Sequence, residues 1–198
     1  VGRNLGNNLK TQGTVTNAGS VAGTTTINGG TTTNTGTLTG DVSVAAAGTL
    51  DNQAGGGLSG NLVTSGTVTN AGTVTGTTTV NGGTTTNAAT GNLTGATSIA
   101  AAATVNNAGS MGAVSNSGTL GSSGTIASLI NNAGTTTNTG TVTGTTTVNG
   151  GAVTSSGTLT GDVDVSAVAT LTNQAGGSLG GNLKTQGTVT NAGSVAGT

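Results

Sequence analysis

The sequence predicts an all-β chain that winds as a three-sided parallel β-solenoid, with about 17 to 18 residues in each coil. Three observations lead to this prediction. An aliphatic side chain recurs at steps of six residues, Asn and Gly gather between these aliphatic positions, and long segments recur at shifts of 53 and 174 residues. Thr, Gly and Asn together make up more than half of the chain, which is low in charge and rich in β-branched residues that favour strands.

The six-residue step determines the kind of element that we expect. It fits neither the 3.6-residue period of a helix nor the two-residue period of one long strand. It fits strands of about three or four residues, each followed by a bend, with one inward aliphatic side chain per side. Gly and Asn supply the bends because they tolerate a positive φ angle at low cost.

The aliphatic residues at this step are expected to form the interior. In chain order, the expected structural core includes Val15, Val21, Ile27, Val68, Val74, Val80, Val142, Val148, Val189 and Val195. The step is irregular between Leu50 and Leu62, and Thr33 and Thr86 stand where an aliphatic residue is expected.

The tripeptides N-A-G and N-G-G mark the corners between the strands. Identical polar side chains that stack on one another can form ladders between the layers of such a structure. The expected turn and ladder residues are Asn17, Asn28, Asn70, Asn81, Asn149 and Asn191, with Asn17, Asn70 and Asn191 in equivalent places.

Internal repeats indicate one continuous solenoid over residues 1–198. Residues 8–24 recur letter for letter at 182–198, and a looser copy begins at Asn61. The two shifts hold about nine and about thirty sides, which are both multiples of three, so we expect three sides per coil and a segment cut from a longer array. Right-handed β-crossovers are the general preference. A left-handed hexapeptide-type coil is the alternative.

Composition excludes several classes of function. Three basic and four acidic residues give a net charge of −1, which argues against nucleic acid as a partner because phosphate binding needs clustered Lys and Arg. No apolar run approaches the length of a membrane span, and no signal peptide is visible at Val1. With no His, Cys, Glu or Tyr, we expect no catalytic residue, no cofactor and no metal ligand.

One pair of carboxylates has the spacing of a catalytic site. Asp162 and Asp164 would lie on one face of a strand, about 6–7 Å apart, which is compatible with a two-carboxylate hydrolase. The simpler interpretation is favoured, in which both are solvent-facing acids beside inward valines. The sequence therefore predicts no enzyme.

Six runs of three threonines allow another function. Outer members of successive runs could stack as a flat array of hydroxyl groups, similar to the arrays of β-helical ice-binding proteins. The irregular steps are expected to interrupt such an array. Thr is also a good strand former that keeps an uncharged surface soluble.

Residues 48–62 and 169–183 share the pattern L-x-N-x-x-G-G-x-L, which in the first copy comprises Leu50, Asn52, Gly55, Gly56 and Leu58. This pattern resembles the haemagglutinin repeats of filamentous-haemagglutinin-type exoproteins, and the phrase TTTVNGG resembles repeats of autotransporter passengers. The resemblance implies a right-handed parallel β-helix, bacterial secretion, and a role in adhesion or surface fibres. It implies no catalytic residues.

These observations together predict a structural rod or fibre segment of a secreted bacterial surface protein, of the adhesin, filament or biofilm-matrix type. We expect its partners to be other copies of itself, end to end or side by side, or glycans of a host or surface. The alternatives are a flat Thr-rich face that binds ice or glycans, and a disordered low-complexity spacer.

Overall fold

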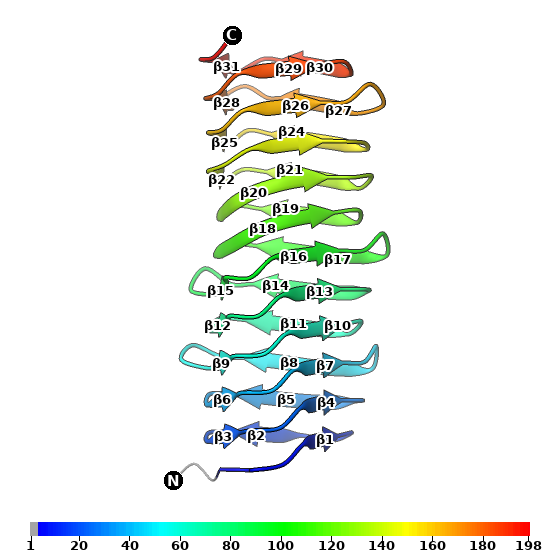
Figure 1. Cartoon of the computed structure of the whole chain (residues 1–198), viewed down its shortest axis with the longest axis vertical. Coiled ribbons are helices and arrows are strands. Elements are labelled where there is room, and N and C mark those ends of the chain that lie inside the picture. Colours follow the sequence, from blue (N-terminus) through cyan, green and yellow to red (C-terminus); the bar gives the residue numbers. More distant parts are fainter. Residues whose placement is uncertain (1–3) are drawn as a thin grey trace.

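The computed structural model describes residues 4–198, which form a single stack of eleven coils (Figure 1). Each coil contributes a strand to each of three faces, and every strand pair is parallel. At about 4.8 Å per coil, the stack is a rod about 50 Å long. The described residues contain no helix that could cross a bilayer.

Face 1 is an eleven-stranded sheet with one strand from every coil. Its strands are β2 (Val15–Asn17), β5 (Gly30–Asn34), β8 (Gly48–Asn52), β11 (Thr67–Asn70), β14 (Gly83–Asn87), β17 (Ala103–Asn107), β19 (Thr119–Ser122), β21 (Thr135–Asn138), β24 (Ala152–Ser155), β27 (Thr170–Asn173) and β30 (Thr188–Asn191).

Face 2 consists of two-residue strands together with the first residues of two longer strands. Its short strands are β3 (Ser20–Val21), β6 (Thr37–Leu38), β9 (Gly57–Leu58), β12 (Thr73–Val74), β15 (Asn92–Leu93), β22 (Thr141–Val142), β25 (Thr158–Leu159), β28 (Ser178–Leu179) and β31 (Ser194–Val195). The longer strands are β18 (Ser110–Asn116) and β20 (Thr125–Asn131), which continue round the corner into face 3. Faces 2 and 3 therefore join as one twenty-stranded sheet.

Face 3 is completed by three-residue strands. They are β1 (Leu9–Thr11), β4 (Thr25–Ile27), β7 (Val42–Val44), β10 (Leu62–Thr64), β13 (Thr78–Val80), β16 (Thr97–Ile99), β23 (Thr146–Val148), β26 (Val163–Val165) and β29 (Leu183–Thr185).

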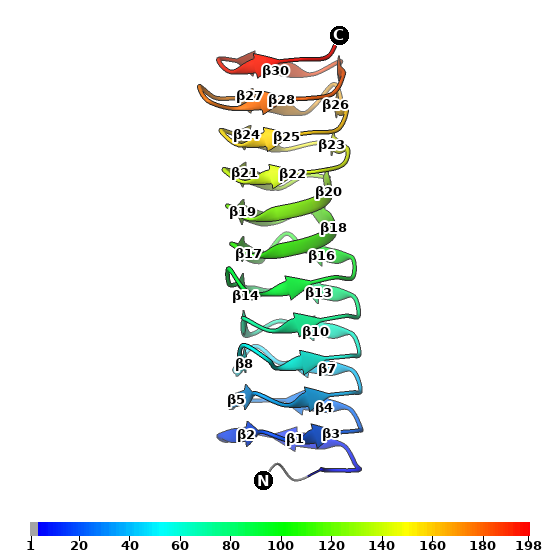
Figure 2. The same ribbon diagram turned by 90° about the vertical axis from the view of Figure 1, so that its left-hand side faces the viewer.

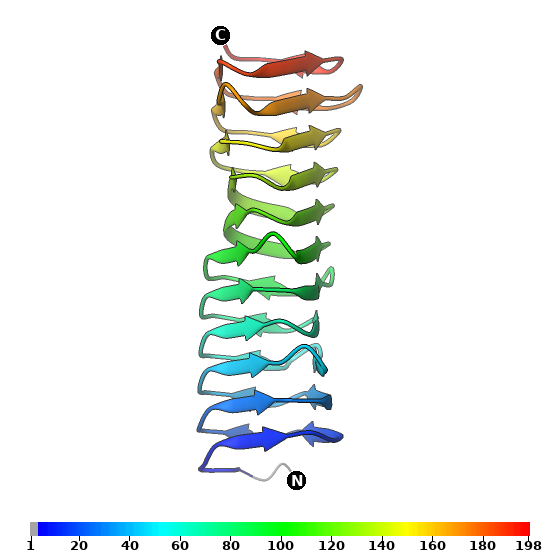
Figure 3. The ribbon, with the colours of Figure 1, turned by 90° about the vertical axis from the view of Figure 1, so that its right-hand side faces the viewer.

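The coil is right-handed. In Figure 1, strands of face 3 lie in front and run to the right, and strands of face 1 lie behind and run back to the left, while the chain rises from the N-terminus to the C-terminus. Figure 2 places the same front strands on its right-hand side, and Figure 3 shows the same straight stack from the opposite side. The left-handed alternative is excluded.

Five side chains of a typical coil point inward: two from face 1, one from face 2 and two from face 3. In the coil that begins at β10, they are Leu62, Thr64, Val68, Asn70 and Val74, all 1% exposed or less. The expectation of one inward aliphatic residue per side is therefore too simple. Strands of three or more residues place both residue i and residue i+2 on the inner side, and the second position holds Asn or Thr in many coils.

The structure places the ten expected core residues in two groups. Seven are at most 3% exposed, namely Val21, Ile27, Val68, Val74, Val80, Val142 and Val148. Val15 and Val189 are half-buried, and Val195 is 38% exposed. These three belong to the first and last coils of the stack, in which each strand pairs on one side only.

Coil length varies from 15 to 20 residues, yet all the strands of face 1 stay in register. The variation lies in the corners. Thr11 to Val15 is a step of four residues, Ile27 to Thr32 a step of five, and Val44 to Leu50 a step of six. Three coils separate Val15 from Val68, and ten separate it from Val189, so both repeat shifts are whole numbers of coils.

The six-residue step wrongly predicts Thr33 and Thr86 as inward residues. The structure buries Thr32 and Thr85 instead, and leaves Thr33 and Thr86 on the outer side. The preceding N-G-G corner is the cause. Its second glycine, Gly30 or Gly83, adopts a φ of 68° or 65°. The step across this corner, from the last inward residue of face 3 to the first of face 1, is five residues, whereas the period predicts six.

Buried threonines of this kind are a target for stabilisation. The Thr85 hydroxyl is fully buried and has no hydrogen-bond partner within the described chain. We expect Thr85→Val to raise the free energy of unfolding by about 1–3 kcal/mol, because a methyl group replaces an unsatisfied polar group of the same shape. Thr136→Val is the control, since the Thr136 hydroxyl donates to Asn131 Oδ1 at 2.8 Å. Its removal breaks this hydrogen bond, so we expect it to lower the free energy of unfolding. Urea denaturation of both variants checks this; equal effects would contradict it.

Candidate functional site

The second inward position of face 1 carries an asparagine ladder along the edge next to face 2. Its members, taken coil by coil, are Asn17, Asn34, Asn52, Asn70, Asn87, Asn107, Ser122, Asn138, Ser155, Asn173 and Asn191. From Asn17 to Asn107, each amide Nδ2 donates to Oδ1 of the next coil at 2.7–2.8 Å. All these bonds run in the same direction, towards the C-terminus.

The ladder amides other than that of Asn107 are also fixed within their own corners. Asn70 Nδ2 donates to the Gly72 carbonyl at 3.2 Å, and Asn34 Nδ2 donates to the Gly36 carbonyl at 3.1 Å. The buried amide thus bonds both to the next coil and to its own turn. Buried polar groups are tolerated when their hydrogen bonds are satisfied in this way.

Two serines interrupt the ladder. Asn138 Nδ2 donates to Ser155 Oγ at 3.2 Å, but the hydroxyl of Ser155 donates to Gly157 in its own turn at 3.4 Å and does not reach the next coil. Consequently Asn173 Oδ1 is buried without a partner. Ser122 has the same effect on Asn138 Oδ1.

We expect Ser155→Asn to repair the ladder and to raise the free energy of unfolding by about 1–3 kcal/mol, the cost of a buried unsatisfied acceptor. The corner after Ser155 reads S-S-G-T and has the same length as N-T-G-T after Asn138, so the larger amide has a precedent in its neighbour. Ser156→Asn, one residue outside the ladder, is the matched control. Thermal unfolding followed by circular dichroism checks this, and a loss of stability for Ser155→Asn would contradict it.

A column of glycines accompanies the ladder at the same corner. Gly72 shows why no other residue fits: a Cβ atom built there would collide with the Gly56 carbonyl oxygen of the preceding coil and lie 2.7 Å from the Gln53 carbonyl oxygen. Gly109, Gly124 and Gly140 face the carbonyl of the preceding glycine in the same way. The pattern N-x-G is therefore a single unit, in which Asn links the coils and Gly lets them approach.

The structure separates the six expected turn asparagines into two kinds. Asn17, Asn70 and Asn191 occupy equivalent ladder positions. Asn28, Asn81 and Asn149 lie outside the ladder, in the corner between face 3 and face 1, and are half-buried or exposed. They follow an inward residue directly, so their side chains point outward. Asn149 alone of these contacts a stacked asparagine, Asn132, with an Nδ2–Oδ1 distance of 3.0 Å.

Most ladder members were not identified from the sequence. Asn34, Asn52, Asn87, Asn107, Asn138 and Asn173 belong to it besides the three above. A usable signal exists, because each comes two residues after the inward residue of face 1, as in V-T-N, L-D-N and T-T-N. Residues two apart on a strand share a side.

All four carboxylates have structural partners on the outer surface. Asp162 Oδ1 accepts the Asn182 backbone N–H at 2.8 Å, and Asp164 pairs with Lys184 at 3.4 Å. A surface hollow of about 420 Å³ lies beside these two acids. Asp41 accepts the Asn61 N–H at 2.8 Å, and Asp51 accepts from Gln53 Nε2 at 3.1 Å. Among residues 4–198 no three acidic or other metal-binding side chains gather as a metal site.

The outer side of face 1 carries two columns of threonine, because each inward aliphatic residue lies between two outward positions. The first column is Thr31, Thr49, Thr67, Thr84, Thr104, Thr119, Thr135, Ala152, Thr170 and Thr188. The second column is Thr16, Thr33, Asp51, Thr69, Thr86, Asn106, Gly121, Thr137, Thr154, Thr172 and Thr190. Coil-length variation does not disturb these columns, contrary to expectation, because the corners absorb it.

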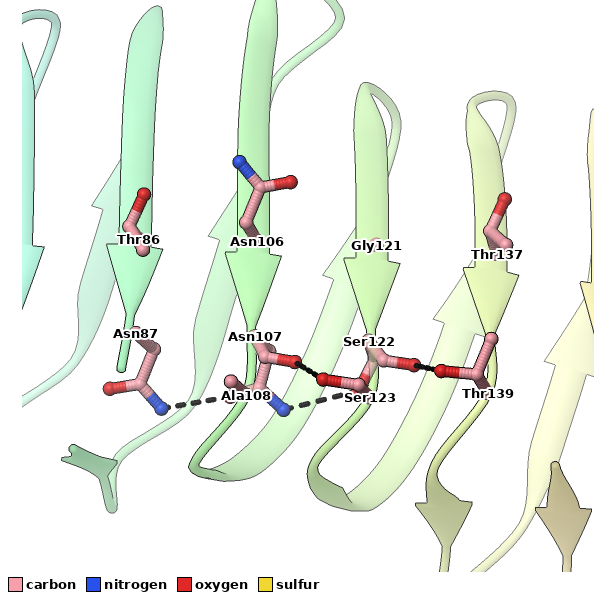
Figure 4. A pocket seen from close by; sticks show the side chains of 10 residues that line it. All are labelled: Thr86, Asn87, Asn106, Asn107, Ala108, Gly121, Ser122, Ser123, Thr137 and Thr139. Atoms are coloured by element: carbon pink, nitrogen blue, oxygen red, sulfur yellow. Dashed lines mark hydrogen bonds between the residues drawn. The ribbon is translucent and has the colours of Figure 1, made fainter. Parts of the chain in front are cut away.

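The second column has a dent at Gly121. Figure 4 shows Thr86, Asn106, Gly121 and Thr137 side by side on successive strands, with ladder residues Asn87, Asn107 and Ser122 below them. The missing side chain at Gly121 opens a surface hollow of about 290 Å³. The dent and the neighbouring Asn106 interrupt the second column between Thr86 and Thr137, and Asp51 interrupts it between Thr33 and Thr69.

Comparison with models of known families, with curated proteins and with solved structures gave no match. The specific haemagglutinin or autotransporter family therefore has no support beyond the quoted residues. The L-x-N-x-x-G-G-x-L pattern nevertheless has a clear structural meaning. Leu50 and Leu58 point inward, Asn52 belongs to the ladder, and Gly55 turns the corner with a φ of 86°. The chain is a parallel β-solenoid repeat protein.

Proposed function

We propose that this chain is a structural rod segment of a longer, secreted bacterial surface protein, of the adhesin, filament or biofilm-matrix type. The observation that carries the proposal is the unbroken stack: eleven coils keep one register on face 1 while their lengths vary. A structure of this kind lengthens by adding coils, since each coil contacts only its neighbours. It holds whatever is attached at its two ends at a fixed distance from each other.

Two further observations support a mechanical role. Each of the four carboxylates has a partner that ties one coil to the next or to its own strand. The segment at 8–24 returns at 182–198 after ten whole coils, so the array repeats in units of coils. The proposal includes no catalysis and an extracellular location, with other copies of the rod or surface glycans as partners.

The test is electron microscopy and fibre diffraction on material shed by cells that make the full-length protein, together with immunogold labelling of intact cells. We expect thin surface filaments with a strong axial spacing of about 4.8 Å. Label confined to the cell interior, or filaments without this spacing, would refute the proposal. A random-coil circular dichroism spectrum of the isolated chain would favour the disordered spacer.

A further inference from the structure

The two threonine columns of face 1 form a surface with unused hydrogen-bonding capacity. Within residues 4–198, none of their hydroxyl groups donates a hydrogen bond to the protein. Threonines in the corner that follows face 2 behave differently. The hydroxyls of Thr75, Thr94 and Thr143 donate to carbonyl oxygens of the preceding coil at 3.0–3.4 Å. The threonine columns of face 1 therefore present free hydroxyls, whereas these corner threonines do not.

The columns are also ordered in two directions. Successive members of one column are about 4.8 Å apart along the rod, and the two columns are about 6.7 Å apart along the strands. The first column is threonine in seven consecutive coils, from Thr31 to Thr135. Thr has few χ1 rotamers, so a backbone held in register also fixes the hydroxyl and methyl positions with little further loss of entropy.

This chemistry fits ordered water better than it fits sugars. The chain has no aromatic residue, so stacking against a sugar ring, the main apolar contact in carbohydrate recognition, has no partner here. Face 1 carries a single charged side chain, Asp51, and so has little attraction for an ionic ligand. What remains is a neutral grid of alternating hydroxyl and methyl groups that repeats in two directions, and such a grid is suited to contact with a regular lattice of water molecules.

We propose that face 1 binds ice, with the two threonine columns as the contact surface. The hydroxyls take the place of lattice oxygens, and the methyl groups hold first-layer water in the cage-like order that lies next to ice. Asp51, Asn106 and Gly121 are the defects of the second column, because each removes a hydroxyl–methyl pair, and Ala152 is the defect of the first column. The proposal adds a ligand to the rod and does not depend on secretion or adhesion.

The test measures thermal hysteresis and ice shaping by the 198-residue chain and by variants that change one face at a time. Thr86→Lys combined with Thr154→Lys places two bulky charges on face 1, and we expect it to lower thermal hysteresis by more than half. Thr79→Lys combined with Thr147→Lys makes the same change on the outer side of face 3, and should leave the activity unchanged. Circular dichroism confirms that each variant is folded.

A gain-of-function variant keeps the proposal falsifiable even if the lysine variants unfold. A Cβ atom at Gly121 would meet only Asn106 Oδ1, at 3.5 Å, so there is room for a side chain. Gly121→Thr combined with Asn106→Thr completes the second column there, and we expect it to raise thermal hysteresis. No activity in the folded chain, equal losses from both lysine pairs, or binding to crystalline cellulose in place of ice would overturn the proposal. So would dimerisation through face 1 without ice activity.

Discussion

Asn70→Ala is expected to lower the free energy of unfolding by about 2–6 kcal/mol, because it leaves two buried ladder groups without their partner at about 1–3 kcal/mol each. Asn52 Nδ2 loses its 2.7 Å acceptor, and Asn87 Oδ1 loses its 2.8 Å donor. Both groups lie at 0% exposure, so water cannot replace the lost bonds. Denaturant unfolding followed by circular dichroism measures the effect.

Asn81→Ala is the matched control for this prediction. Asn81 also stands in an N-G corner, but it is exposed and lies outside the ladder. We expect its loss to change the free energy of unfolding by less than about 0.5 kcal/mol, as is usual for surface positions. If Asn70→Ala and Asn81→Ala proved equally mild, the ladder would be a consequence of the stacking and not a source of its stability.

Gly72→Ala is expected to cost at least about 3 kcal/mol, at or above the upper end of the range for overpacked sites. The new methyl group would occupy the position of the Gly56 carbonyl oxygen, and relief requires separating two coils whose strands β9 and β12 are hydrogen-bonded. The lost bonds include Thr73 N–H to the Gly56 carbonyl at 3.0 Å. Thermal unfolding measures the effect.

Gly57→Ala tests whether the effect belongs to the glycine column or to glycine in general. No atom lies within 4 Å of a Cβ built at Gly57, although it is only one residue beyond a column member, Gly56. We expect no loss of stability, and a small gain would be consistent with a reduced entropy of the unfolded chain. A large loss at Gly57 would mean that the corner requires glycine for its backbone conformation alone.

The sequence was sufficient to predict the architecture, and the reason is physical. A parallel solenoid must return the chain to the same place after every coil, so periodicity in Val, Leu and Ile reports the coil length and the number of sides. The step of four residues from Leu58 to Leu62 departs from the six-residue period, but it is the ordinary step from face 2 to face 3. The step of eight from Leu50 to Leu58 is made of two residues along face 1, from Leu50 to Asn52, and six residues across the corner, from Asn52 to Leu58.

The inward polar residues could not be predicted from the aliphatic period. Thr32 and Thr85 are buried because the positive φ of a glycine two residues earlier sets the register, and hydrophobicity carries no record of that angle. Likewise, whether an asparagine enters the ladder or faces solvent depends on its being two residues or one residue after an inward side chain, as Asn70 and Asn81 show. Corner geometry, not composition, decides both.

The single direction of the asparagine ladder gives the rod a polarity. Since every intact ladder bond runs from Nδ2 in one coil to Oδ1 in the next, the amide dipoles add along the axis, with donors facing one way and acceptors the other. Two such stacks can continue one ladder only head to tail, because a head-to-head junction would bring donor against donor. Any filament built by extending this stack would therefore have two chemically different ends.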